Sequence, residues 1–219
     1  MADVNIFLFI PNLIGYGRII LALISFLLMP SRPMGASICY FLSAFLDAFD
    51  GYAARLYNQG TRFGAMLDQL TDRLAFVALL MTLCTFYPRW LFVFQLVVII
   101  DIASHWLHLH ATDLTGKDTH KESKNQILHY YYTSRPFLFF MCFGNEAFFS
   151  LLYINAFWSG PSLLGIYFIP FLAFIFFWVA LVKQLISIVH LVVASQTVAE
   201  FDRKRKNIAN ILKNPCFKK

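Results

Sequence analysis

The stretch DAFDGYAARLYNQGTRFGAMLDQLTD, residues 47–72, places four aspartates between apolar segments. Asp47 and Asp50 are three residues apart, so both lie on one face of a helix. Asp68 and Asp72 are four residues apart and share a helix face in the same way. If the two helices run antiparallel, both pairs lie at a similar depth, because a helix rises about 1.5 Å per residue. The sequence therefore predicts a helical hairpin on which four carboxylates converge.

The rest of the chain is typical of a membrane protein. Its 219 residues are 59% hydrophobic and only 14% charged, which differs strongly from a soluble globular domain. A transmembrane helix needs about 20 mostly apolar residues. Six stretches meet this requirement: residues 13–29, 34–57, 63–86, 90–110, 135–157 and 164–193. We predict an all-α integral membrane protein with six transmembrane helices in a catalytic domain at residues 1–199, followed by a basic cytosolic tail at residues 200–219.

The positive charges predict the orientation. Six spans place both termini on one side of the membrane, together with the loops at residues 58–62 and 111–134. These segments and their flanks carry most of the 18 lysines and arginines. Because basic residues are enriched on the cytosolic side, we expect both termini in the cytosol. The hairpin with the four aspartates then opens toward the cytosol.

Carboxylates within a membrane are rarely without a function, because a charge at the bilayer centre costs about 3 kcal/mol or more. Two divalent cations would balance the four negative charges. Mg²⁺ and Mn²⁺ prefer carboxylate oxygens, and the stretch contains no Cys or His to favour zinc. Two such cations can stabilise both sides of a phosphoryl displacement. The alternative is a hairpin whose aspartates reach toward the interface and hold no ligand.

The spacing of the stretch also resembles a family signature. Eight positions fit D-x-x-D-G-x-x-A-R-x(8)-G-x-x-x-D-x-x-x-D, namely Asp47, Asp50, Gly51, Ala54, Arg55, Gly64, Asp68 and Asp72. This is the motif of the CDP-alcohol phosphotransferases. The segments NIFLFIPNLIGYGRI (5–19), DIASHWLHLH (101–110) and YYTSRPFLF (131–139) are similar to the eukaryotic phosphatidylinositol synthase branch of that family.

The resemblance implies a six-helix homodimer in the endoplasmic reticulum membrane, with a metal site open to the cytosol. It implies that Asp47, Asp50 and Asp68 bind one cation, that Asp47, Asp68 and Asp72 bind a second, and that Asp72 is the general base. Gly51, Arg55, Thr61 and Asn12 would bind CDP-diacylglycerol. Many members carry N-x-x-T-x-x-R on the first helix, whereas this chain has Gly15 at the threonine position, between Asn12 and Arg18.

Other polar residues are candidates for contact with the acceptor. Asp101, His105 and Arg135 could bind inositol hydroxyls, which need donors and acceptors; the alternative for the first two is a polar helix end. Lys183, Gln184, Ser187 and His190 form a polar stripe that favours hydrogen bonds between helices over substrate contact. Glu146 is expected to pair with a buried base such as Arg18.

The resemblance implies an enzyme that transfers the phosphatidyl group from CDP-diacylglycerol to myo-inositol and releases CMP. The motif alone leaves glycerol 3-phosphate or serine open as acceptors. A divalent-cation transporter is a second class, but the four aspartates lie near one membrane face and no polar path continues across. A scaffold without catalysis fits poorly with an intact motif. Membrane lipid is an expected partner, and nucleic acid is not.

Overall fold

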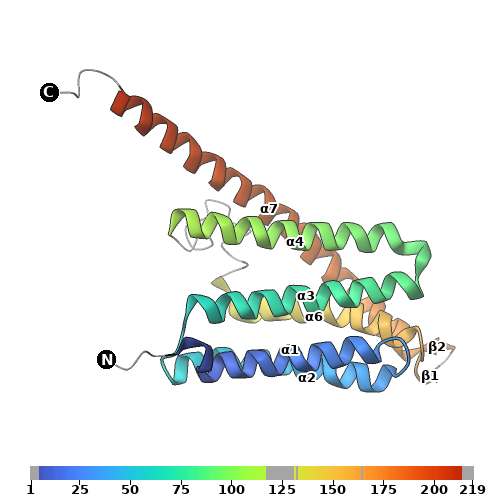
Figure 1. Cartoon of the computed structure of the whole chain (residues 1–219). Coiled ribbons are helices and arrows are strands. Elements are labelled where there is room, and N and C mark those ends of the chain that lie inside the picture. Colours follow the sequence, from blue (N-terminus) through green and yellow to red (C-terminus); the bar gives the residue numbers. More distant parts are fainter. Residues whose placement is uncertain (1–4, 117–130, 132, 164, 214–219) are drawn as a thin grey trace. The chain divides into compact units, whose positions relative to one another are not determined.

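The computed structural model describes residues 5–116, 131, 133–163 and 165–213. The chain is built almost entirely from helices (Figure 1). The long helices are α1 (Ile10–Leu28), α2 (Pro33–Leu56), α3 (Arg62–Phe86), α4 (Leu91–Thr115), α6 (Arg135–Asn155) and α7 (Phe168–Lys213). Two short 3-10 helices, η1 (Ile6–Leu8) and η2 (Pro88–Trp90), precede α1 and α4.

The lengths and compositions of these helices confirm the all-α membrane class. Within the described residues, five helices are long and apolar enough to cross a membrane: α1, α3, α4 together with η2, α6 and α7. Helix α2 has 24 residues but is not one of the five, and its second half carries Asp47, Asp50 and Arg55. The number of six spans and the cytosolic orientation of the termini stay predictions.

The chain divides into two compact units. The first unit comprises Met1–Gln95 and Glu146–Ile175, and the second comprises Leu96–Asn145 and Phe176–Lys219. The first unit therefore contains the whole α1–α3 segment with the four aspartates. The second contains most of α4 and α7.

In the first unit, α1 packs along both α2 and α3. Small and hydroxyl side chains allow this close approach, as is common between membrane helices. The Ser25 hydroxyl donates to the Ala36 carbonyl at 2.8 Å, and the Ser43 hydroxyl donates to the Arg18 carbonyl at 3.0 Å. These two bonds join α1 to α2 along their length and fix the depth of Arg18 relative to the aspartate pair on α2.

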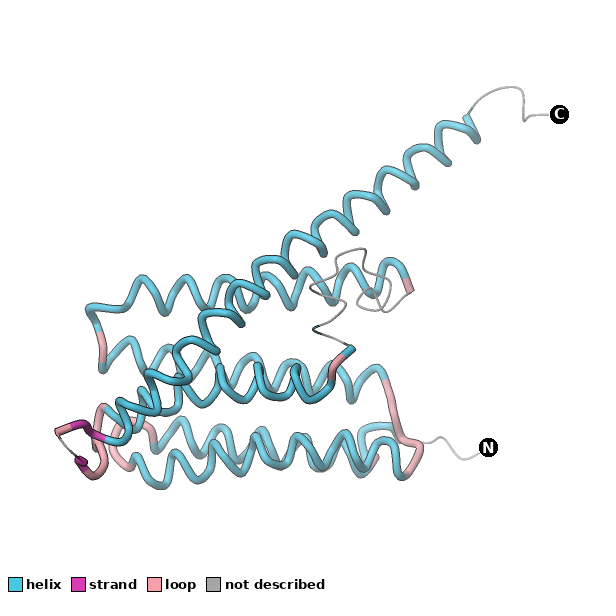
Figure 2. Tube along the Cα trace, turned by 180° about the vertical axis from the view of Figure 1, so that it is seen from behind, coloured by secondary structure: helices cyan, strands magenta, loops and turns pink. Residues whose placement is uncertain are grey.

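A short hairpin that the sequence analysis did not predict precedes α7. Strand β1 (Ser162–Leu163) pairs antiparallel with strand β2 (Ile166–Tyr167), and Figure 2 shows both strands in magenta. Gly165 has a φ of 80°, a conformation that glycine adopts readily. The predicted start of the sixth span at residue 164 was therefore wrong, because α7 begins at Phe168. Helix α7 continues without a break to Lys213, and the separate tail domain at residues 200–219 stays a prediction.

Gly144 on α6 allows a close contact in the second unit. A Cβ atom at this position would lie 2.4 Å from Cγ1 of Val179 on α7, so even one methyl group overpacks the contact. We expect Gly144→Ala to lower the free energy of unfolding by about 1–3 kcal/mol, measured by denaturant unfolding in detergent. Gly17→Ala is the matched control, since nothing lies within 4 Å of its added Cβ. Equal stability of the two variants would contradict the close contact.

Candidate metal centre and adjoining pocket

The α2–α3 hairpin forms with the turn where the sequence predicted it. Helix α2 ends at Leu56 and α3 begins at Arg62. In the connecting loop Asn58 has a φ of 52°, which asparagine tolerates better than most residues. The Gln59 side-chain oxygen accepts a hydrogen bond from the Ile10 backbone N–H at 2.9 Å. This bond ties the loop to the first residue of α1.

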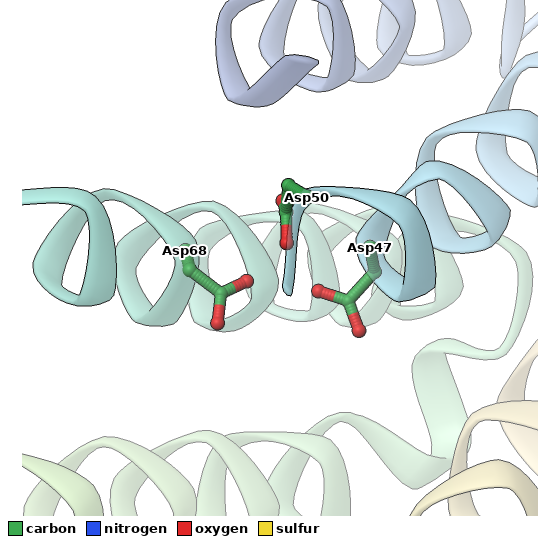
Figure 3. A group of neighbouring side chains, drawn as sticks. All are labelled: Asp47, Asp50 and Asp68. Carbon is green, nitrogen blue, oxygen red and sulfur yellow. The ribbon is translucent and has the colours of Figure 1, made fainter. Parts of the chain in front are cut away.

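The hairpin brings carboxylates of both helices together. Asp47 and Asp50 lie in the second half of α2, and Asp68 lies in the second turn of α3 (Figure 3). Each of the three offers one carboxylate oxygen, and these oxygens lie within 4.8 Å of one another. Three hard oxygen donors at this spacing suit a divalent cation such as Mg²⁺ or Mn²⁺. The donor chemistry therefore fits the cations expected from the sequence.

The arginine of α1 contacts all four predicted aspartates. Nη1 of Arg18 lies 2.6 Å from Asp50 Oδ2 and 2.6 Å from Asp68 Oδ1. Its Nη2 lies 2.8 Å from Asp47 Oδ1 and also contacts Asp72 Oδ1. Arg18 thus links α1 to both helices of the hairpin.

Arg18, the example of a buried base for Glu146, has other partners in the structure. The aspartates of α2 and α3 surround the guanidinium and supply its ion pairs. Glu146 instead accepts a hydrogen bond from the Tyr40 hydroxyl at 3.0 Å. Sequence reasoning missed the contact between Arg18 and the aspartates. The N-x-x-T-x-x-R pattern of the first helix, in which Arg18 follows Asn12 by six residues, could have indicated a role for this arginine.

The guanidinium and the carboxylates differ in exposure. The Arg18 side chain is 1% exposed, whereas those of Asp47, Asp68 and Asp72 are 42%, 44% and 36% exposed. Asp50 is buried as well, with a side chain only 10% exposed. The arginine therefore lies on the buried side of the cluster, and three of the carboxylates are accessible from outside the protein.

A pocket of about 560 Å³ adjoins the cluster. The residues predicted to bind CDP-diacylglycerol all line it, together with two of the aspartates: Asn12, Gly51, Arg55, Thr61, Asp50 and Asp68. The structure thus brings these predicted residues into one cavity. Sequence reasoning did not single out Asn58 and Gln59, which also line it.

Two glycines shape the wall between α1 and α3. A Cβ at Gly64 would lie 2.9 Å from Oδ1 of Asn12 and 3.2 Å from Oγ1 of Thr61. A Cβ at Gly15 would lie 3.0 Å from Cδ2 of Leu67. A larger residue at position 15 would therefore crowd the Leu67 side chain of α3, and glycine avoids this contact.

The polar atoms of this wall already have partners within the protein. Asn12 is 1% exposed and donates from Nδ2 to the Ile6 carbonyl at 2.6 Å. The Thr61 hydroxyl accepts from the Gly64 backbone N–H at 3.0 Å and caps α3. A hydroxyl that accepts in this way keeps its own hydrogen to donate to a ligand.

The predicted acceptor residues lie in the second unit. Asp101 is 2% exposed, and its Oδ1 lies 3.6 Å from Nδ1 of His105. The His190 ring of α7 lies 4.4 Å from the His108 ring and 6.1 Å from the His105 ring, measured between centroids. Arg135 is the exposed first residue of α6. The structure therefore places the His190 ring beside His105 and His108, a contact that sequence reasoning had not predicted.

The polar stripe on α7 makes one of the interhelical hydrogen bonds expected of it. Gln184 Nε2 donates to Asn145 Oδ1 on α6 at 3.2 Å. Lys183 Nζ lies 3.3 Å from the Ser187 hydroxyl, one turn along the same helix. Hydrogen bonding within and between helices thus accounts for part of the stripe.

Comparison with known proteins assigns the chain to a family. The model of the CDP-alcohol phosphatidyltransferase family matches residues 8–194. A CDP-diacylglycerol–inositol 3-phosphatidyltransferase of Rattus norvegicus is 52% identical over 205 residues, covering 92% of this chain and 96% of that protein. The protein of the same name from Candida albicans is 44% identical over 204 residues, covering 90% of this chain and 85% of that protein. No solved structure shows a significant match. The chain belongs to the CDP-alcohol phosphatidyltransferase family, which confirms the resemblance.

Proposed function

We propose that this chain transfers the phosphatidyl group of CDP-diacylglycerol to myo-inositol, giving phosphatidylinositol and CMP. The observation that carries the choice of acceptor is the 52% identity, over nearly the whole chain, to a rat protein named for this reaction. The convergent aspartates and the adjoining pocket support phosphoryl transfer independently.

Two divalent cations, Mg²⁺ or Mn²⁺, are the cofactors of this proposal. Asp47, Asp50 and Asp68 would hold one, and Asp47, Asp68 and Asp72 the other. The grouping of the first three carboxylates within 4.8 Å supports the first set. When bound, such cations neutralise the diphosphate and stabilise the charge that develops in phosphoryl transfer.

The pocket residues would hold the cytidine diphosphate part of the donor. Arg55 carries a forked set of donors suited to phosphate oxygens, and the Thr61 hydroxyl can donate one hydrogen bond. Gly51 leaves the wall open, since a Cβ there would meet only the Arg55 side chain, at 3.6 Å. The exposed apolar side chains of the helices would keep the acyl chains in lipid.

Asp72 would act as general base on the acceptor. It takes the proton of an inositol hydroxyl while that oxygen forms a bond to the phosphatidyl phosphorus. The bond from this phosphorus to the bridging oxygen breaks, and CMP leaves with the electron pair. The phosphatidyl group passes directly between substrates, with no bond to the protein.

Asp101, His105 and Arg135 are proposed as contacts for the inositol hydroxyls. The mixture of a carboxylate, an imidazole and a guanidinium suits a polyol, which both donates and accepts. We further propose residence in the endoplasmic reticulum membrane as a homodimer, with the aspartates facing the cytosol.

The reaction can be tested with the purified chain in lipid nanodiscs. We expect labelled phosphatidylinositol and an equal amount of CMP from CDP-diacylglycerol with myo-inositol and Mg²⁺ or Mn²⁺, and neither product with chelator. Serine and glycerol 3-phosphate serve as competing acceptors. A lipid product from one of these alone would overturn the acceptor, and cation-independent turnover would overturn the cation site.

A further inference from the structure

We propose that Arg18 is a positioning residue that acts as the built-in counter-ion of the aspartate cluster and lowers the affinity of the cluster for divalent cations. Its guanidinium would hold the carboxylates in place from the buried side, while cations bind from the accessible side. The inference deepens the proposed function, because it rests on the proposed cation site.

The first argument is the division of carboxylate oxygens. The guanidinium contacts one named oxygen of each aspartate: Oδ1 of Asp47, Oδ2 of Asp50, Oδ1 of Asp68 and Oδ1 of Asp72. An ionised carboxylate has two oxygens and about four sites for acceptance. One oxygen of each group can therefore face the arginine while the second is available to a cation.

The second argument is burial. The Arg18 side chain is 1% exposed, and its Nε is a buried N–H group without a hydrogen-bond partner. A buried guanidinium is costly to desolvate, and it is retained only where its charge is compensated. The four carboxylates supply that compensation, so the arginine and the cluster depend on one another.

The third argument is the charge balance. One guanidinium against four ionised carboxylates leaves three negative charges, and their mutual repulsion destabilises the α2–α3 hairpin until a cation binds. Arg18 reduces this repulsion at all times, since arginine stays protonated. The same charge repels an incoming divalent cation across a few ångströms, and that repulsion remains appreciable near a protein surface. Arg18 would thus keep the hairpin assembled at the expense of cation affinity.

A coupling experiment tests this role. Thermal unfolding of the wild type and Arg18→Met is followed in detergent with chelator and with saturating Mn²⁺. Loss of a partner from a buried ion pair predicts a fall in Tm of about 10 °C with chelator. We expect Mn²⁺ to restore most of this loss, and calorimetric titration to show Mn²⁺ binding to Arg18→Met at least about tenfold tighter than to the wild type.

Two further variants serve as controls. Arg89→Met removes an exposed arginine beyond the far end of α3 and should change neither Tm nor Mn²⁺ affinity. Arg18→Lys keeps the charge without the fork, and its Tm with chelator should lie between those of the wild type and Arg18→Met. If Arg18→Met cannot be purified even with Mn²⁺ present, Arg18→Gln, which also removes the charge but keeps a polar head, gives the same comparison of Tm and Mn²⁺ affinity.

Three results would overturn the inference. An equal loss of Tm with chelator and with Mn²⁺ would make Arg18 a structural residue only. Weaker Mn²⁺ binding by Arg18→Met would show that the arginine does not oppose the cation. Absence of saturable Mn²⁺ binding by the wild type would remove the cation site itself. A failure of inositol transfer would leave these readouts unchanged, since none of them depends on turnover.

Discussion

Asp72→Asn is expected to reduce turnover by about 10²- to 10⁴-fold while Mn²⁺ still binds. The amide has nearly the same shape as the carboxylate but cannot accept the proton of the attacking hydroxyl. Asp72 lies outside the group of three carboxylates whose oxygens converge within 4.8 Å, although it contacts the same guanidinium. Its loss should therefore affect the chemical step more than the binding of the first cation. Rates of CMP release and calorimetric Mn²⁺ titration measure the two effects separately.

The control for this variant is Asp113→Asn, which makes the same chemical change at an exposed position of α4. It should keep both the rate and the Mn²⁺ affinity. A wild-type rate for Asp72→Asn would exclude Asp72 as the base. Loss of all Mn²⁺ binding would instead show that Asp72 is essential for cation binding, and another residue would then have to act as the general base.

Asp50→Asn is expected to weaken Mn²⁺ binding at least about tenfold and to lower activity by more than about 100-fold. Asp50 is the most enclosed of the four aspartates, with a side chain 10% exposed, and it belongs to the convergent group. Neutralising it removes one of three oxygen ligands and leaves a neutral amide against the guanidinium. The decisive comparison is with Asp72→Asn, since only the Asp50 variant should lose the stabilisation that Mn²⁺ gives to the wild type.

High concentrations of Mn²⁺ should restore part of the activity of Asp50→Asn, because a weakened site can still be filled by mass action. The same concentrations should do nothing for Asp72→Asn. If Mn²⁺ stabilises the Asp50 variant as strongly as the wild type, the cation does not bind at the convergent carboxylates.

The candidate site could be predicted from the sequence to the extent that it depends on local spacing. Separations of three and four residues place each aspartate pair on one helix face, and the short polar loop 57–61 makes the two helices antiparallel. The position of Arg18 could not be obtained in this way. Its partners depend on how far α1 slides along α2, which is fixed by the Ser25 and Ser43 hydrogen bonds.

The sequence predicted which segments are helical better than it predicted the residues at which the helices begin and end. Hydropathy placed the end of the last span at residue 193, but a helix does not need apolar residues to continue. Glu200 with Lys204, and Asp202 with Lys206, stand four apart in the order that supports a helix in water. The β-hairpin before α7 also escaped detection, since its strands have only two residues each.

The length of α7 has a mechanical consequence. Its 46 residues extend for about 69 Å at about 1.5 Å per residue, which is more than twice the thickness of the hydrocarbon layer, about 30 Å. Tilting it enough to bury all of it would require an angle beyond 60° from the membrane normal, whereas membrane helices average about 20°. A large part of α7 therefore extends beyond the hydrocarbon layer, and the Arg203–Lys206 charges stand on a continuous helix instead of on a loose chain.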